Sequence, residues 1–128
     1  MLPIMAKKIL VIEDDKDIRD TLVYVLEEQG YEVVSSEEAK ILKSLDTIKP
    51  DLILLDNWLT EWKSDANGQQ ISKQLKSNPA TSHIPIVIIS AVSNIQEIAE
   101  AGMADDYLRK PFNLTDIIEI VKKHADKI

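Results

Sequence analysis

The chain contains no cysteine, only three glycines and a single phenylalanine among its 128 residues. The absence of cysteine excludes disulfides, thiol catalysis and thiolate metal sites, and it fits a reducing cytosol. No apolar run approaches the roughly 18 residues that a membrane-spanning helix requires. The 22 acidic residues exceed the 15 Lys and Arg residues, and the resulting net charge of −7 argues against nucleic acid as a direct ligand. We therefore expect a cytoplasmic protein that binds neither a membrane nor DNA.

The length and the hydrophobic share of 45% describe one ordinary globular domain. A chain of this size buries about two-thirds of the surface that it exposes when unfolded. The apolar start, Met1–Met5, is too short for a signal peptide and lacks the usual basic residues. We expect a single domain over residues 1–128, with a flexible leader at 1–6.

Strand and helix patterns alternate along the chain. Short, apolar strands are expected at residues 8–12, 32–35, 52–55, 84–89 and 107–109. The segments after the strands carry apolar residues at helical spacing, with Ser36 as the expected N-cap of the second helix. Asn113, followed by Asp116, is expected to cap the last helix, and the fourth helix, near 95–101, is short. This order predicts an α/β fold of three layers: a five-stranded parallel sheet with five helices on its two faces.

Acidic residues follow two of the expected strands. The first strand runs into Glu13, Asp14 and Asp15, and the third runs into Asp56. If these strands are neighbours, Glu13, Asp14 and Asp56 converge at one sheet edge. Two carboxylates about 5 Å apart repel by roughly 3 kcal/mol at an effective dielectric constant near 20. The cluster therefore requires a cation, and Mg²⁺ is the natural candidate because it prefers oxygen ligands.

Two further polar residues stand at strand ends of the same sheet edge: Ser90 after the fourth strand and Lys110 after the fifth. Asp56 can act as a nucleophile toward phosphorus, and Glu13 and Asp14 can hold the cation. Lys110 supplies a positive charge to the transferred group, and the Ser90 hydroxyl can bond a phosphoryl oxygen. No residue is an obvious general base for a separate substrate, so the protein itself is the expected acceptor.

Four segments, in order and at compatible spacing, resemble the receiver domain of two-component response regulators: residues 9–15, 50–56, 85–91 and 105–112. The resemblance extends along almost the whole chain. It implies a flavodoxin-like sheet with strand order 2-1-3-4-5. It also implies a phosphoprotein of phosphorelay signal transduction whose only chemistry is its own phosphorylation and dephosphorylation, and not an enzyme with a separate substrate.

The same resemblance assigns roles to individual residues. Asp56 accepts a phosphoryl group from a sensor histidine kinase or a histidine phosphotransfer protein. Mg²⁺ is bound by Glu13, Asp14, Asp56 and the main-chain carbonyl of Trp58.

The remaining implied roles concern the response to phosphorylation. Ser90, the Ala91 backbone N–H and Lys110 contact the phosphoryl oxygens, and Ser90 and Tyr107 are the switch residues. The Lys110–Pro111 peptide bond is expected to be cis. Because no DNA-binding or enzymatic segment follows residue 128, we expect a stand-alone receiver, a monomer or weak dimer, that signals to a protein partner.

The chain departs from the family pattern after Asp56. Receivers usually have Pro four residues after the phosphorylated Asp and Gly eight residues after it, whereas here Thr60 stands at the first place and the nearest Gly is Gly68. The loop is thus about four residues longer, and it contains Trp62. In the family, the position of Trp58 influences how easily water reaches the phosphoryl group, so we expect Trp58 to shield the aspartyl-phosphate.

Two other function classes remain open, and some acidic residues and histidines are expected to have no role in the site. A haloacid-dehalogenase-like phosphatase also uses an Asp nucleophile, but it needs a second Asp where this chain has Trp58. A flavodoxin-like cofactor binder needs a phosphate loop rich in Ser, Thr and Gly after the first strand, which this chain lacks. The acids Asp15, Asp17 and Asp105 are expected to be solvated caps. His83 and His124 are expected at the surface, since neither has a companion His at metal-ligand spacing.

Overall fold

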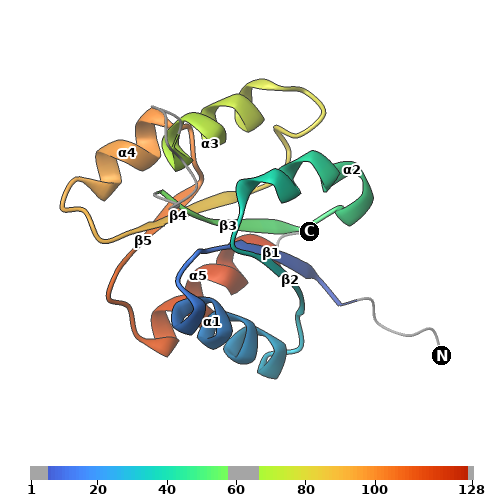
Figure 1. The fold of residues 1–128 in the computed structure, drawn as a ribbon, viewed down its shortest axis with the longest axis vertical. Coiled ribbons are helices and arrows are strands. Elements are labelled where there is room, and N and C mark those ends of the chain that lie inside the picture. Colours follow the sequence, from blue (N-terminus) through green and yellow to red (C-terminus); the bar gives the residue numbers. More distant parts are fainter. Residues whose placement is uncertain (1–5, 58–66, 127–128) are drawn as a thin grey trace.

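A five-stranded parallel sheet forms the centre of the molecule (Figure 1). The computed structural model describes residues 6–57 and 67–126. The strands are β1 (Lys8–Ile12), β2 (Glu32–Ser36), β3 (Leu52–Asp56), β4 (Ile86–Ser90) and β5 (Asp106–Arg109). They lie side by side in the order β2-β1-β3-β4-β5 and all pair in parallel, so the predicted strand order is confirmed.

Helices cover both faces of the sheet. They are α1 (Lys16–Glu28), a 3₁₀ helix η1 (Ala39–Ser44), α2 (Leu45–Ile48), α3 (Gly68–Ser77), α4 (Ile95–Ala101) and α5 (Leu114–Ala125). Figure 1 shows α1 and α5 on one face and α2, α3 and α4 on the other. The three-layer α/β fold predicted from the sequence is thus confirmed.

The core consists of two apolar layers, one on each face of the sheet. On the side of α1 and α5, alternate strand residues such as Ile9 and Val11 pack with Leu22 and Val121. On the other side Leu10 and its neighbours pack beneath α2, α3 and α4. Because both faces are covered, β3 and β4 are buried at every position, and their sequences are continuous apolar runs up to the last residue.

The structure confirms the cap that the sequence predicts for the last helix but not the one that it predicts for the second helix. Asn113 and Asp116 form the predicted capping box of α5. Ser36 is not an N-cap: it is the last residue of β2, and its hydroxyl bonds the backbone of Glu38. The segment after it begins as the 3₁₀ helix η1 and reaches α-helical geometry only at Leu45. Such local bonds between a serine side chain and the backbone compete with helix formation.

Helix α4 has the short length that its sequence predicts, seven residues, and it ends against α3. A Cβ atom added to Gly102 would lie 2.8 Å from the carbonyl oxygen of Gln69 on α3. Glycine at this position therefore allows the two helices to approach closely. The next residue, Met103, has φ +59°, a left-handed conformation that favours glycine after a helix.

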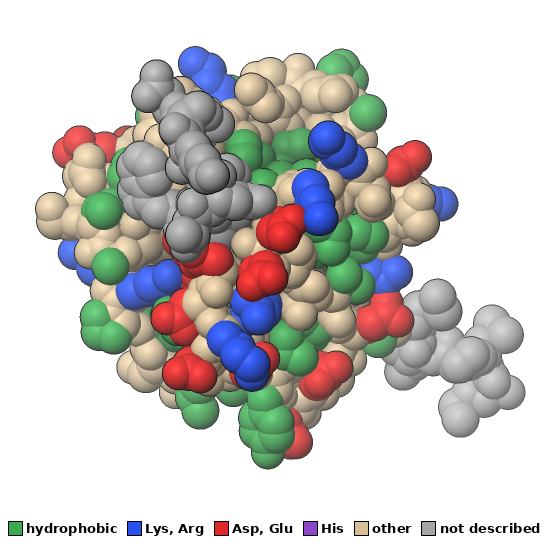
Figure 2. All heavy atoms as spheres, viewed as in Figure 1, with side chains coloured by type: hydrophobic (Ala, Val, Ile, Leu, Met, Phe, Trp, Pro, Cys, Tyr) green, Lys and Arg blue, Asp and Glu red, His purple; other side chains and the backbone are tan. Residues whose placement is uncertain are grey.

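The surface in Figure 2 carries acidic and basic side chains interspersed with each other. Ion pairs among the described residues include Lys16 with Asp20 and Lys76 with Asp105. On this face the negative charge of the protein is therefore not gathered into one patch.

Candidate functional site

The first part of the site is the turn between β1 and α1. The Glu13 N–H donates to the Ser36 carbonyl, which extends the pairing of β1 and β2 by one residue, and the Glu13 side chain is fully buried. Asp15 caps α1 by accepting from the Ile18 N–H at 3.0 Å, as its prediction as a helix cap requires. Its own N–H donates to Oε2 of Glu13 at 3.3 Å. The turn thus holds a buried carboxylate beside the positive end of a helix dipole.

Asp56 completes an acidic cluster at the end of β3. In the β1–β3 register Ile12 lies opposite Leu55, so Glu13 and Asp56 leave their strands side by side. One carboxylate oxygen from each of Glu13, Asp14 and Asp56 lies within 4.8 Å of the other two. Asp56 is only 5% exposed. The sequence-predicted convergence of these three acids is therefore what the fold produces.

Lys110 provides positive charge to this cluster. Its Nζ lies 2.7 Å from Oε1 of Glu13 and 3.5 Å from Oδ2 of Asp56. Burial alone lowers the pKa of Lys110, but the contact with Glu13 and the charge of Asp56 outweigh it, and the net pKa is raised. The Lys110 ammonium is therefore held in its charged form between two buried carboxylates. The Lys110–Pro111 peptide bond is cis.

Ser90 ends β4 at the same sheet edge. Asp56 is paired with Ile89 in the β3–β4 register, so Ser90 stands one residue beyond the acid on the next strand. Ser90 is 3% exposed, and its hydroxyl accepts from the Val92 N–H at 3.3 Å. Ala91, which follows it, is exposed. Tyr107 lies on β5 opposite Ile88 and is half-buried.

Asn57 is a buried residue of this region that the sequence analysis did not single out. Its backbone N–H bonds the Ile89 carbonyl at 3.0 Å, and its side-chain oxygen accepts from the Gln69 N–H at 3.0 Å. The Gly68 N–H donates to the Asn57 carbonyl at 2.9 Å, and a Cβ on Gly68 would lie 2.7 Å from the Asn57 Cα. The first turn of α3 is thus attached directly to the residue after Asp56. The dipeptide Asn67-Gly68 was the available signal, since Asn67 is the N-cap of α3.

Comparison with known proteins identifies this arrangement. The family model for the response regulator receiver domain matches residues 9–122. The chain belongs to the response regulator receiver family. The phosphate regulon transcriptional regulatory protein PhoB of Escherichia coli is 37% identical over 122 residues, which cover 92% of this chain and 51% of PhoB. This receiver thus spans about half the length of such curated relatives.

Solved structures agree with this assignment. The receiver domain of NtrX from Brucella abortus is 29% identical, with a TM-score of 0.80 over 94% of this chain and 99% of that one. A putative response regulator from Chloroflexus aurantiacus has the same fold, with a TM-score of 0.86 at 24% identity over 96% of this chain and all of that one. The matches favour neither the phosphatase nor the flavodoxin-like cofactor binder as an alternative.

Some predictions for this receiver fall outside the described residues or stay untested. Trp58, Thr60 and Trp62 lie outside the residues that the structure describes, and so does most of the proposed leader. The roles assigned to individual site residues, the stand-alone organisation and the oligomeric state also remain predictions. Within residues 6–57 and 67–126, no helix is both long enough and apolar enough to cross a membrane.

The prediction that His124 lies at the surface is wrong. His124 is 5% exposed, and its Nε2 lies 2.8 Å from Oδ2 of Asp106 on β5, because the last turn of α5 folds against that strand. Burial alone raises the pKa of Asp106, but its hydrogen bonds with His124 and the Tyr107 N–H lower it, and the net pKa is lowered. His83 is exposed, as predicted.

Asp105 is more than a solvated cap. Its carboxylate accepts from the Ile86 N–H at 2.8 Å and pairs with Lys76 at 2.9 Å, so it connects the start of β4 with α3. Asp17 is exposed in the first turn of α1, as expected.

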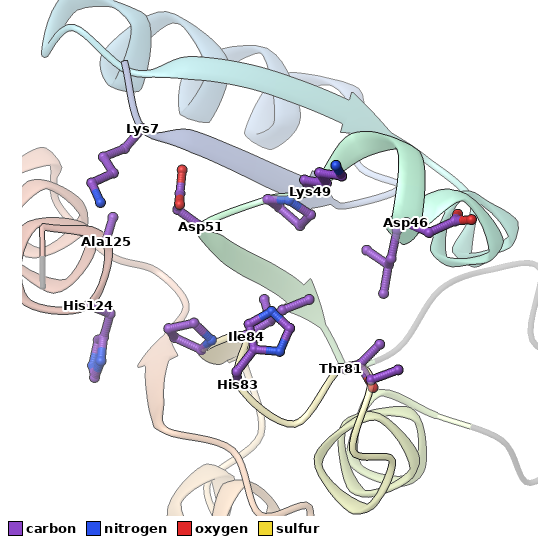
Figure 3. A pocket seen from close by; sticks show the side chains of 13 residues that line it. Lys7, Asp46, Lys49, Asp51, Thr81, His83, Ile84, His124 and Ala125 are labelled. Carbon is purple, nitrogen blue, oxygen red and sulfur yellow. The ribbon is translucent and has the colours of Figure 1, made fainter. Parts of the chain in front are cut away.

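Among the described residues, cavities lie at both ends of the strands, one at the carboxyl ends and one at the amino ends. One of about 420 Å³ opens beside Lys110 and is lined by Ile18, Thr21 and Phe112, among others. The other, of about 730 Å³, lies at the amino ends of the strands (Figure 3). There the ring of His124 points away from Lys7 and Asp51. Only the first cavity adjoins the acidic cluster.

Proposed function

We propose that this receiver takes a phosphoryl group onto Asp56 from a phosphohistidine of a sensor kinase or a phosphotransfer protein. A carboxylate oxygen of Asp56 forms the new bond to phosphorus while the nitrogen–phosphorus bond of the donor breaks. The electron pair of that bond remains on the imidazole nitrogen, which then takes up a proton. The observation that carries this proposal is the meeting of Glu13, Asp14 and Asp56 in one cluster, in which the carboxylates of Glu13 and Asp56 share the Lys110 ammonium.

The acidic cluster fits Mg²⁺. Oε1 of Glu13 is buried, and the Lys110 ammonium lies 2.7 Å from it as an ion-pair partner. Such an oxygen is a suitable ligand for a hard cation, and Glu13, Asp14 and Asp56 together offer the carboxylate oxygens that Mg²⁺ prefers. The carbonyl of Trp58 is the fourth ligand that we propose. Bound there, Mg²⁺ would offset the negative charge that the transferred group brings.

The chain's own residues would then hold the phosphoryl group. Lys110, already charged beside Asp56, is placed to pair with a phosphoryl oxygen. The Ser90 hydroxyl and the Ala91 N–H are the other proposed donors, because both stand at the neighbouring strand end. Phosphorylation adds about −1.5 to −2 charges. These donors gain bonds only in the phosphorylated state, and that difference would bias the positions of Ser90 and Tyr107 toward a signalling conformation.

The proposed partners follow from this chemistry. The phosphodonor would approach over the cavity beside Lys110, whose walls include Ile18 and Phe112. The output partner is proposed to be a protein that recognises the altered surface. The only reactions of the protein itself would be its phosphorylation and the hydrolysis of its aspartyl-phosphate.

Intact mass spectrometry after incubation with acetyl phosphate tests the proposal. Wild type should gain one phosphoryl group in the presence of Mg²⁺ and none in EDTA, and Asp56→Asn should gain none. Asp15→Asn is a matched control, because it removes a nearby acid while asparagine still caps α1. The proposal fails if Asp56→Asn is still phosphorylated, or if the reaction needs no divalent ion.

A further inference from the structure

Arg19 connects α1 to the acidic turn through the main chain. Its Nη1 donates to the Glu13 carbonyl at 2.9 Å and lies 3.4 Å from the Asp14 carbonyl as a second acceptor. Both residues belong to the acidic cluster. The guanidinium therefore contacts two of the three cluster residues, and in these bonds the acceptors are main-chain carbonyls rather than carboxylates.

These bonds restrict how the turn can move. The Glu13 N–H is bonded to the Ser36 carbonyl, and Arg19 bonds the backbone carbonyl of the same residue, Glu13. Because both backbone groups of Glu13 are bonded, its backbone is fixed, and this sets the direction in which its side chain leaves the backbone. The bond to Asp14 extends the restraint to the next residue. Hydrogen bonds from a charged group are stronger than neutral ones, and arginine stays charged at all relevant pH values.

We propose that Arg19 is a positioning residue for the metal: by holding the carbonyls of Glu13 and Asp14, it keeps their carboxylates directed into the acidic cluster. This inference rests on the proposed Mg²⁺ site. Removal of a group that orients a metal ligand typically lowers the metal affinity 10- to 100-fold.

The charge of Arg19 and its positioning role predict opposite effects on Mg²⁺ binding. A positive charge near an anionic metal site repels the cation, so its removal alone should strengthen Mg²⁺ binding. Loss of the two carbonyl bonds should instead weaken binding, because the carboxylates lose their common orientation. The sign of the change in affinity therefore separates the two roles.

The test is calorimetric titration of the intact chain with MgCl₂. We expect Arg19→Met to raise the Kd for Mg²⁺ about tenfold. Lys16→Met is the matched control: Lys16 lies in the same first turn, and its ammonium pairs with Asp20 in solvent. Its removal should leave the Kd unchanged or slightly lower. Arg19→Lys retains the charge but has a shorter reach, and we expect a Kd several-fold above wild type.

A second measurement distinguishes positioning from general destabilisation. The rate of phosphorylation by acetyl phosphate is measured as a function of Mg²⁺ concentration. For Arg19→Met the half-saturating concentration should rise about tenfold while the rate at saturation stays close to wild type. A purely structural role would lower the saturated rate instead.

The outcomes separate this inference from the function on which it rests. If wild type binds Mg²⁺ and Arg19→Met binds it equally or more tightly, the inference is overturned and the proposed function stands. If Arg19→Met does not fold, an unchanged Kd in Arg19→Lys overturns the inference, and a raised one supports it. If wild type itself does not bind Mg²⁺, the proposed function fails, and the inference fails with it.

Discussion

Replacement of Lys110 by methionine should destabilise the metal-free protein, because it leaves Glu13 and Asp56 buried together without their shared cation. The Lys110 ammonium lies 2.7 Å from the Glu13 carboxylate and 3.5 Å from the Asp56 carboxylate. At an effective dielectric constant of about 20, it attracts them by roughly 6 and 5 kcal/mol, respectively. The cost of burying the charges offsets part of this attraction. Removal of one partner of a buried ion pair typically costs about 3–5 kcal/mol. The Lys110 side chain is 18% exposed, so we expect a loss of about 3 kcal/mol.

Urea unfolding in EDTA and in MgCl₂ measures this effect. In EDTA, Lys110→Met should have a free energy of unfolding about 3 kcal/mol below that of wild type. Mg²⁺ restores positive charge to the cluster, and at a hundredfold excess over its Kd a ligand stabilises by about 2.7 kcal/mol. Because the competing ammonium is gone, the gain from a given Mg²⁺ concentration should be larger in the variant than in wild type.

The control removes a lysine that is largely exposed to solvent. Lys123→Met removes a lysine whose ammonium lies 3.4 Å from Asp106 but whose side chain is 65% exposed, so its loss should cost at most about 1 kcal/mol with or without Mg²⁺. If Lys110→Met is as stable as wild type in EDTA, the Lys110 pair does not stabilise the metal-free site. An equal gain from Mg²⁺ in both proteins would refute the competition between ammonium and metal.

Three further predictions concern the scaffold around the site. Asn57→Ala leaves the Gln69 N–H without its acceptor, so the free energy of unfolding measured by urea titration should fall by about 1–3 kcal/mol. A change below about 0.5 kcal/mol would contradict the attachment of α3 at this residue. Met103 has a φ of +59°, a conformation that costs a non-glycine residue about 1–2 kcal/mol. Met103→Gly removes this strain, and the strain is larger than the cost of the extra conformational entropy that glycine has in the unfolded chain. The thermal midpoint of the variant should therefore be higher than that of wild type, and a lower midpoint would refute this. Asp106 has a pKa lowered from its ordinary value of 3.8, so its ionised form stabilises the fold above pH 3.8, and this contribution is lost as the pH falls through the folded-state pKa. Asp106→Asn should therefore show a shallower loss of stability with acid below pH 3.8, and a slope equal to that of wild type would exclude this role.

The sheet and the acidic cluster were predictable from local patterns. Apolar runs such as 52–55 occur in parallel strands that are covered on both faces, and the polar residue that ends each run marks the carboxyl edge. The capping box at Asn113 was equally readable, because its two partners are only three residues apart. Such features depend on neighbours in the sequence, so the chain specifies them before it folds.

Other features depend on contacts between distant segments. Lys110 was expected beside Asp56, yet its shorter contact is with Glu13, since the longer glutamate side chain reaches the ammonium from β1. His124 was misplaced because nothing near it in the sequence shows that α5 ends against Asp106.

The sequence alone determined which residue types stand at the strand ends, and with them the receiver family and the chemistry of an oxygen-rich cation site. The tertiary structure alone decided which backbone groups support that site. Arg19 reaches back to the Glu13 carbonyl, and Asn57 holds the first turn of α3. These bonds use backbone N–H and C=O groups, which every residue carries, so no side-chain pattern in the sequence announces them.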